Sequence, residues 1–135
     1  MSMLINCNYL INMKLIINSS IIELSLLNNK TANIIRNSTK FSSSINTWGD
    51  EIYFKTPING VKLEENARDT MNFGEVDYWV EGNSIAIGFG ITPASVNNEI
   101  RLVSNVNIWA KFDTKLHDIN FFRSIEDGDL IKLLN

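Results

Sequence analysis

The stretch Gly74–Pro93, GEVDYWVEGNSIAIGFGITP, decides the fold of this chain. Its two halves, Glu75–Val80 and Ser84–Gly90, are rich in β-branched and aromatic residues, which favour β-strands. Between them lies the short turn Glu81–Asn83, and the second half runs into a proline, which cannot donate to a neighbouring strand. The stretch therefore predicts an antiparallel hairpin at the centre of the sequence.

Alternation of apolar and polar residues predicts further strands on both sides of this hairpin. They are Lys14–Asn18, Ile21–Leu26, Asp50–Lys55, Glu99–Val103, Val106–Phe112 and Asp129–Leu134. The first two are separated only by a pair of serines, so they form a second hairpin. We expect Ser42–Ser44 to be loop, and residues 59–70 to be a polar loop with at most one short strand.

Two helices are expected between the strands. Asn28 or Asn29 is placed to cap a helix that runs to about Ser38. Thr114–Ile125 has apolar residues at helical spacing, and Asp113 is available as its cap. Those apolar residues are Leu116, Ile119, Phe122 and Ile125. The whole pattern predicts an all-β (mainly β) protein of about eight strands with two helices.

The composition narrows the classes of function. At 135 residues the chain has the size of one domain, with 44% hydrophobic and 20% charged residues, which is ordinary for a globular protein. A net charge of −3 and a pI near 5.1 argue against a nucleic-acid or anionic-membrane partner. No apolar run reaches the roughly 18 residues that a membrane-spanning helix needs. The single cysteine, Cys7, excludes an intramolecular disulfide, so we expect a cytoplasmic protein.

The first residues differ from the rest of the chain. Met1–Asn12, MSMLINCNYLIN, has no basic region before its apolar residues and no small-residue cleavage site, so a signal peptide is not expected. Strand periodicity begins at Met13. We therefore predict a single domain at residues 13–135 and an N-terminal extension at residues 1–12, with a functional arm as the alternative.

Two blocks carry a resemblance to a known family. Asn46–Pro57, NTWGDEIYFKTP, and Gly74–Pro93 resemble the cyclophilin-like family of small, uncharacterised bacterial and archaeal proteins. Members carry a similar TWGDEIYF and a similar GD-x-x-YW-x-x-G followed by FG-x-TP. The resemblance covers Met13 to the C-terminus and implies a closed antiparallel barrel whose open ends are plugged by two helices. It implies a fold more than an activity, because the family is defined by its barrel and not by a known reaction.

Three residue patterns that often carry chemistry have plainer interpretations here. His117 is the only histidine and lies on a predicted helix, without the second His or Cys that a zinc or catalytic site needs. Cys7 has no basic neighbour to lower its pKa, so it is not a candidate nucleophile. Gly88–Gly90 ends a strand rather than opening a helix, so it is not a phosphate-binding loop. We expect no metal site and no cofactor.

The carboxylates of two strands are more informative. Alternation places Glu51 with Tyr53 on one face of its strand, and Glu75 and Asp77 with Trp79 on one face of theirs. If the two strands are neighbours, these side chains share the outer wall of the barrel. Paired carboxylates near aromatics suit acid–base chemistry or a metal. A solvated outer face produces the same pattern and is the favoured interpretation.

The fold also suggests prolyl isomerisation. Matching Ile52–Lys55 to the cyclophilin motif Ile-Phe-His-Arg places Lys55 where that family has its catalytic arginine. Lysine does not reproduce the planar fork of arginine. The glutamine-bearing FMxQGGD segment has no counterpart, and Asn105 or Val106 stands in the region of the proline-pocket histidine. Phe89 matches the segment that lines the proline pocket, although its alternation with neighbouring isoleucines favours the core. Most of the catalytic set is absent.

We therefore predict a barrel that binds a small molecule or a proline-containing peptide on its wall, without efficient isomerase activity. The alternatives are a weak peptidyl-prolyl isomerase, with Lys55 as its catalytic candidate, and an interaction domain with no pocket. Small residues at Ala86, Gly88 and Gly90 would leave a shallow trough on the outer face, which favours binding. The predicted ligand-binding residues are Glu51, Tyr53, Lys55, Trp79, Phe89 and Thr92.

Overall fold

The computed structural model describes residues 11–135, and this part of the chain begins with the first hairpin. Strands β1 (Ile11–Ile17) and β2 (Ser20–Leu26) pair in antiparallel register through a two-residue turn. The turn residues Asn18 and Ser19 have φ values of 49° and 72°, a left-handed geometry that matches the twist of paired strands. The predicted hairpin is confirmed. Of the proposed extension, residues 1–10, including Cys7, lie outside the described residues.

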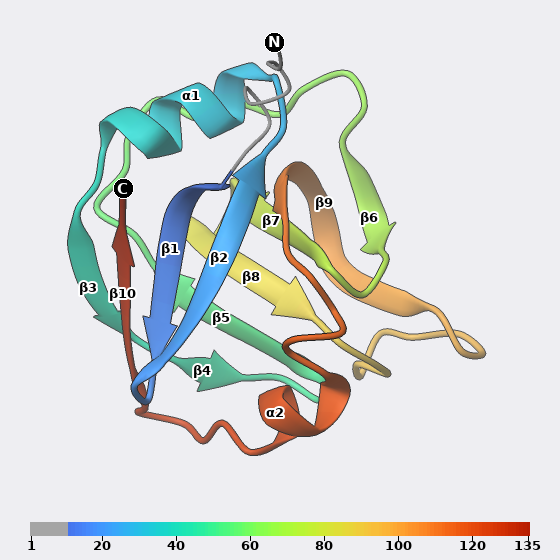
Figure 1. Ribbon diagram of the computed structural model, residues 1–135. Helices are drawn as coiled ribbons and strands as arrows, with labels where there is room; N and C mark the ends of the chain where they lie inside the picture. Colours follow the sequence, from blue (N-terminus) through green and yellow to red (C-terminus); the bar gives the residue numbers. More distant parts are fainter. Residues whose placement is uncertain (1–10) are drawn as a thin grey trace, which may run out of the picture.

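Nine antiparallel strands form one curled sheet (Figure 1). Their order is β3-β10-β1-β2-β9-β7-β8-β5-β4. Only Ile45 separates the outermost strands, β3 and β4, along the chain, so the sheet returns on itself and nearly closes. The strands not yet named are β3 (Phe41–Ser44), β4 (Asn46–Thr47), β5 (Glu51–Lys55), β6 (Arg68–Met71), β7 (Glu75–Trp79), β8 (Ser84–Gly88), β9 (Ile100–Lys111) and β10 (Leu130–Leu134). The predicted mainly-β barrel is confirmed.

Two short helices cover opposite ends of the barrel (Figure 1). Helix α1 (Lys30–Asn37) is capped by Asn29, whose side chain accepts from the Ala32 N–H. Helix α2 (Ile119–Arg123) inserts Phe122, which is fully buried and contacts Phe89 and Phe112. The interior is filled by one apolar cluster. Its largest fully buried members are Trp109, Tyr78, Phe54, Phe122, Met13, Leu15, Ile17, Ile22, Leu24, Ile35, Ile45 and Ile52.

Helix α2 is shorter than its apolar spacing predicted. It begins after Asp118, which caps it, and not after Asp113. Asp113 instead accepts from the Lys115 N–H at 2.8 Å in a single turn, and Leu116 is 71% exposed. The prediction of a helix over Thr114–Ile125 was wrong in its extent because the spacing included Leu116, which is mostly exposed and does not join the core.

Two strand predictions also need correction. Ser42–Ser44 is not loop, because it pairs with β10 in β3. Glu99–Val103 and Val106–Phe112 are not separate strands, because β9 continues through the polar residues between them. Its first half pairs with β6, and its second half pairs with β7 and β2. Because β9 changes its partner strands along its length, it continues as one strand even where the alternation of apolar and polar residues is interrupted.

No helix among residues 11–135 is both long and apolar enough to cross a lipid bilayer.

Candidate functional site

The outer wall of the barrel carries the acidic and aromatic side chains identified in the sequence. Tyr53 of β5 pairs with Ala86 of β8, which pairs with Asp77 of β7, so the three side chains lie on one face. Glu51 pairs with Gly88 on the same face. This wall is not solvated: Glu51 is 8% exposed, Glu75 is 7% exposed and Asp77 is inaccessible. The favoured interpretation, a solvated face, is therefore wrong.

A second layer of chain buries this wall. Strand β6 and the first half of β9, residues 100–106, form a two-stranded unit that we call the β6–β9 ribbon. In Figure 1 it stands to one side of the barrel. Its buried residues Met71, Leu102 and Val106 pack with Trp79, Ile100 and Ile108 as a small apolar cluster separate from the main core. The ribbon therefore removes the acidic wall from water.

The small residues of β8 accommodate this ribbon. A Cβ at Gly88 would lie 2.5 Å from Ile100 Cγ2 and 3.2 Å from Met71 Sδ. Ala86 is 1% exposed. The trough expected over Ala86 and Gly88 is therefore filled by protein, and the space for a ligand lies elsewhere.

A pocket opens at the edge of this second layer. It has a volume of about 150 Å³, and its lining comes from the segment before β5, from β5, from β7 and from the β6–β9 ribbon. The lining residues are Trp48, Glu51, Tyr53, Trp79, Leu102, Val103 and Val106. Val103, 60% exposed, lies at the rim, whereas Leu102 and Val106 are buried. The pocket is thus largely apolar, with one carboxyl group in its lining.

The aromatic side chains of the pocket are held in place. The rings of Tyr53 and Trp79 meet edge to face, with centroids 6.3 Å apart, an arrangement favoured by aromatic quadrupoles. The Trp79 indole N–H donates to Ser104 Oγ at 2.8 Å. Trp48 precedes a tight turn in which its backbone N–H donates to the Glu51 carbonyl. That turn requires glycine at Gly49, where φ is +59° and a Cβ would lie 2.9 Å from Pro93 Cδ.

Glu51 faces this pocket without a compensating group. Among the described residues its carboxyl has no hydrogen bond or ion pair, and burial raises its pKa from 4.5 to about 7. Near neutral pH the group is therefore divided between its protonated and ionised forms. A buried carboxyl in this state responds to any charge that enters the pocket.

Asp77 lies deeper in the same wall. Neither carboxyl oxygen has a hydrogen-bond partner among the described residues. Burial, followed by the nearby charges of Glu51 and Glu75, raises the pKa of Asp77 well above its usual range. The protonated form of Asp77 is therefore favoured relative to an exposed aspartate.

Glu75 differs because the ribbon supplies its counter-charge. Arg68 of β6 donates to both Glu75 oxygens, at 3.1 and 2.7 Å, and the Asn72 N–H donates at 2.7 Å. Burial acts to raise the pKa of Glu75, but these interactions outweigh it and the pKa is lowered. Glu75 is thus an ionised, structurally engaged residue.

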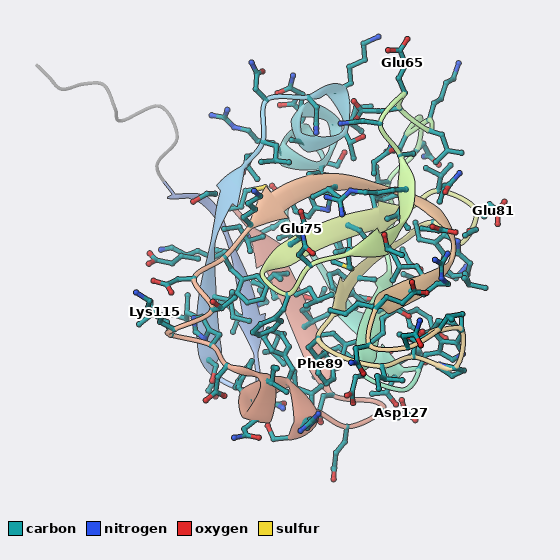
Figure 2. All side chains as sticks on the ribbon, turned by 90° about the vertical axis from the view of Figure 1, so that its right-hand side faces the viewer. Glu65, Glu75, Glu81, Phe89, Lys115 and Asp127 are labelled. Carbon is teal, nitrogen blue, oxygen red and sulfur yellow. The ribbon has the colours of Figure 1, made fainter. Side chains whose placement is uncertain are left out.

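The remaining predicted ligand-binding residues lie apart from the pocket. Lys55 is exposed at the far end of β5, and Phe89 is buried against Phe122 of α2. Figure 2 labels Phe89 near this helix and Glu75 beside the strands of the acidic wall. Thr92 is buried in a loop, where its hydroxyl donates to the Arg101 carbonyl. The structure therefore brings together only Glu51, Tyr53 and Trp79 of the predicted set.

Sequence reasoning missed four lining residues. Trp48 was within reach, since it lies in the TWGDEIYF block beside Glu51. No local signal marks Leu102, Val103 and Val106, because they reach the pocket only through the pairing of β9 with β6.

Comparison with known proteins identifies the fold. A sequence model of the family described as Cyclophilin-like matches residues 11–133. The solution structure of the hypothetical protein AF2241 from Archaeoglobus fulgidus is 30% identical, covers 90% of this chain and 92% of its own, and superposes with a TM-score of 0.73. No curated protein sequence gives a significant match.

A more distant structural match is McbB in complex with tryptophan, at 10% identity and a TM-score of 0.64. The match covers 91% of this chain but only 44% of the McbB chain. At this identity the likeness shows a shared fold alone.

Proposed function

The chain belongs to the cyclophilin-like family, and from this premise we propose that it binds a small molecule in the barrel-wall pocket and is not an efficient prolyl isomerase. The observation that carries the proposal is the pocket itself, in which three aromatic side chains surround one buried, unpaired carboxyl group. Such a combination of apolar wall and single polar anchor is typical of small-molecule sites.

The size of the pocket favours a small ligand over a peptide. A cavity of about 150 Å³ holds a group the size of one benzene ring. A peptide would need an extended groove, and the trough that was expected to provide one is filled by Met71 and Ile100. A larger ligand would have to place one ring or branched group in the pocket and extend past the exposed Val103.

The distant match supports the proposal in a limited way. McbB, which shares the fold, is described in complex with tryptophan, a small molecule with one aromatic ring system. The fold therefore occurs in a protein that binds a small molecule, although the match covers only 44% of the McbB chain, and the choice of ligand rests on the residues of this chain.

The isomerase alternative finds less support. Its only candidate donor, Lys55, lies outside the pocket and is exposed, so it cannot act in the desolvated environment that strengthens such a donor. Phe89, the candidate pocket wall, faces the core.

Ligand-observed NMR with a library of ring-sized fragments tests the proposal. We expect several fragments to bind the wild-type protein, and binding to fall at least about tenfold in Trp79→Ala and in Tyr53→Ala, because aromatics supply much of the contact energy in such pockets. Leu116→Ala, which alters an exposed apolar side chain outside the pocket, is the control and should bind as wild type does. Fragments that bind all four proteins equally would refute this site.

A further inference from the structure

The unpaired carboxyl of Glu51 indicates the chemistry of the ligand. Glu51 is more than nine-tenths buried, lines the pocket, and has no hydrogen-bond or ion-pair partner among the described residues. A buried ionised carboxylate is stable only when a cation or hydrogen-bond donor satisfies it. In this pocket no residue among 11–135 supplies that group, which leaves the place open to a ligand.

We propose that the ligand is an organic amine whose ammonium group binds Glu51 and whose body, a single ring or branched aliphatic group, packs among Trp48, Tyr53 and Trp79. This inference rests on the proposed function and names the chemical class of its ligand.

The lining of the pocket favours a cation over an anion. Glu51 is the only charged side chain among the lining residues, and no Lys, Arg or His joins it. The aromatic residues beside it present π faces or edges, and π faces attract ammonium groups within about 6 Å of a ring centroid. A carboxylate together with aromatic rings is the combination that recognises amines in proteins.

The surroundings add negative potential. Glu75 carries an ionised carboxylate on the same wall, and the charges of Glu51 and Glu75 both reach Asp77, whose pKa they raise. Arg68 binds Glu75, and Arg101 of β9 binds Asp69 and Glu99. Lys111 is exposed, interacts electrostatically with Glu75 and does not line the pocket. A cation that enters the pocket therefore meets an acidic wall, and no positive side chain in the pocket lining competes with it.

A metal ion fits less well. Among residues 11–135, no three His, Cys, Asp or Glu side chains are grouped to hold one. Glu75 is occupied by Arg68, and the raised pKa of Asp77 disfavours the ionised form that a metal binds, so Glu51 alone would offer a ready oxygen ligand. Hard divalent ions need several oxygen ligands.

Three probes of similar size test the inference: benzylamine, benzyl alcohol and benzoate. Isothermal titration and NMR shifts of the Trp48 and Trp79 indole N–H groups at pH 8 report binding. We expect benzylamine to bind at least about tenfold more tightly than benzyl alcohol, since both can donate a hydrogen bond to the Glu51 carboxylate but only the ammonium group adds charge–charge attraction. Benzoate should bind most weakly.

The pH dependence has a definite sign. The ammonium binds the ionised form of Glu51, whose pKa in the free protein is about 7. An alkylamine, with a pKa of about 10, remains protonated throughout this range of pH. Benzylamine affinity should therefore rise about tenfold from pH 6 to pH 8. A ligand that needs protonated Glu51 would show the opposite trend.

Two variants complete the test. Glu51→Gln should reduce benzylamine affinity at least about tenfold, remove its pH dependence, and leave benzyl alcohol unchanged. The same change at Glu81, which is exposed and projects from the molecule in Figure 2, should leave all three affinities unchanged. If Glu51→Gln does not fold, the pH series on the wild-type protein decides.

The outcomes separate the two proposals. If benzyl alcohol binds as tightly as benzylamine at this site, the amine inference fails and small-molecule binding stands. If benzylamine affinity falls as pH rises, the amine inference also fails. If none of the probes and no ring-sized fragment binds, both proposals fail together.

Discussion

Three carboxylates on one wall of the barrel have different states because their partners differ. Glu75 is ionised, since Arg68 and a backbone N–H satisfy both of its oxygens. Asp77 has no hydrogen-bond partner among residues 11–135, and burial raises its pKa. Glu51 lies between these cases, because burial raises its pKa to about 7 and it lines the pocket. The pKa of each carboxyl group therefore follows from the cations and hydrogen-bond donors around it, and not from its burial alone.

Glu51→Gln should stabilise the free protein at pH 8. The pKa of Glu51 rises from 4.5 in the unfolded chain to about 7 in the fold, so its ionisation opposes folding and wild-type stability falls as pH rises between these values. Full ionisation corresponds to about 3 kcal/mol by linkage, and glutamine avoids that penalty. Urea unfolding at pH 5 and pH 8 measures the difference between the two proteins. A difference that does not grow with pH would contradict the raised pKa.

Arg68→Ala tests the ion pair with Glu75, whose contribution to stability rises with pH, whereas that of Glu51 falls with pH. It leaves the buried Glu75 carboxylate without its main partner and should destabilise the protein by about 1–3 kcal/mol at pH 7, below the range for fully buried pairs because Arg68 is 39% exposed. The pKa of Glu75 is lowered in the fold, so the stability from this pair is present above the unfolded pKa and is lost as pH falls. The loss in Arg68→Ala should therefore shrink near pH 4, and Glu75→Gln in the same chain should restore part of the stability.

At the scale of elements, the β6–β9 ribbon covers one wall of the barrel and completes the pocket there. Without it, the outer faces of β5, β8 and β7 would be open to water and their carboxyl groups would be ordinary surface acids. With it, a second apolar cluster forms over the wall, and the ribbon edge supplies Leu102, Val103 and Val106 to the pocket. The close approach of the ribbon depends on the lack of a side chain at Gly88.

Gly88→Ala should displace the ribbon from the barrel. Its Cβ would lie 2.5 Å from Ile100 Cγ2, so we expect a loss of about 1–3 kcal/mol, as for other overpacked sites. Adding Ile100→Ala removes the clash, so the double variant should lose less than the sum of the two single losses. A double-mutant cycle by urea unfolding measures this coupling. Additive losses would show that Ile100 does not limit the approach.

At the scale of the whole molecule, proteins that share a barrel fold do not necessarily share a catalytic activity. The family match covers residues 11–133, yet the residues that would carry prolyl isomerisation are mostly absent. The position of greatest chemical interest is instead the pocket at the edge of the ribbon.

Isomerase activity on Ala-Pro peptides should be at least about a hundredfold below that of an ordinary cyclophilin. Loss of one preorganised donor typically lowers the rate by about 10²–10³, and here the arginine is replaced while the glutamine and histidine are missing. Lys55→Ala should change nothing measurable, because Lys55 is exposed and outside the pocket. A protease-coupled assay on both proteins measures this. Turnover near cyclophilin levels that is lost in Lys55→Ala would establish the alternative.

The sequence by itself determined what depends on local physics. The hairpins, the cap at Asn29 and the two faces of β5 and β7 all follow from turn residues, capping chemistry and period-two alternation. These signals predicted a mainly-β chain with two helices, and the family resemblance implied the barrel. Alternation gave Glu51 and Tyr53 one face and Trp79 one face, and it joined them on one wall only if β5 and β7 were neighbours, whereas β8 lies between them.

Only the tertiary structure decided which side of that wall meets water. Alternation indicates that a strand has two faces, but burial of the outer face depends on β6 reaching β9, where Arg68 pairs with Val106 far along the chain. That non-local pairing buries Asp77, gives Glu51 its raised pKa and completes the pocket. No local pattern encodes it, because the free energy that fixes the ribbon comes from contacts formed only once the barrel is folded.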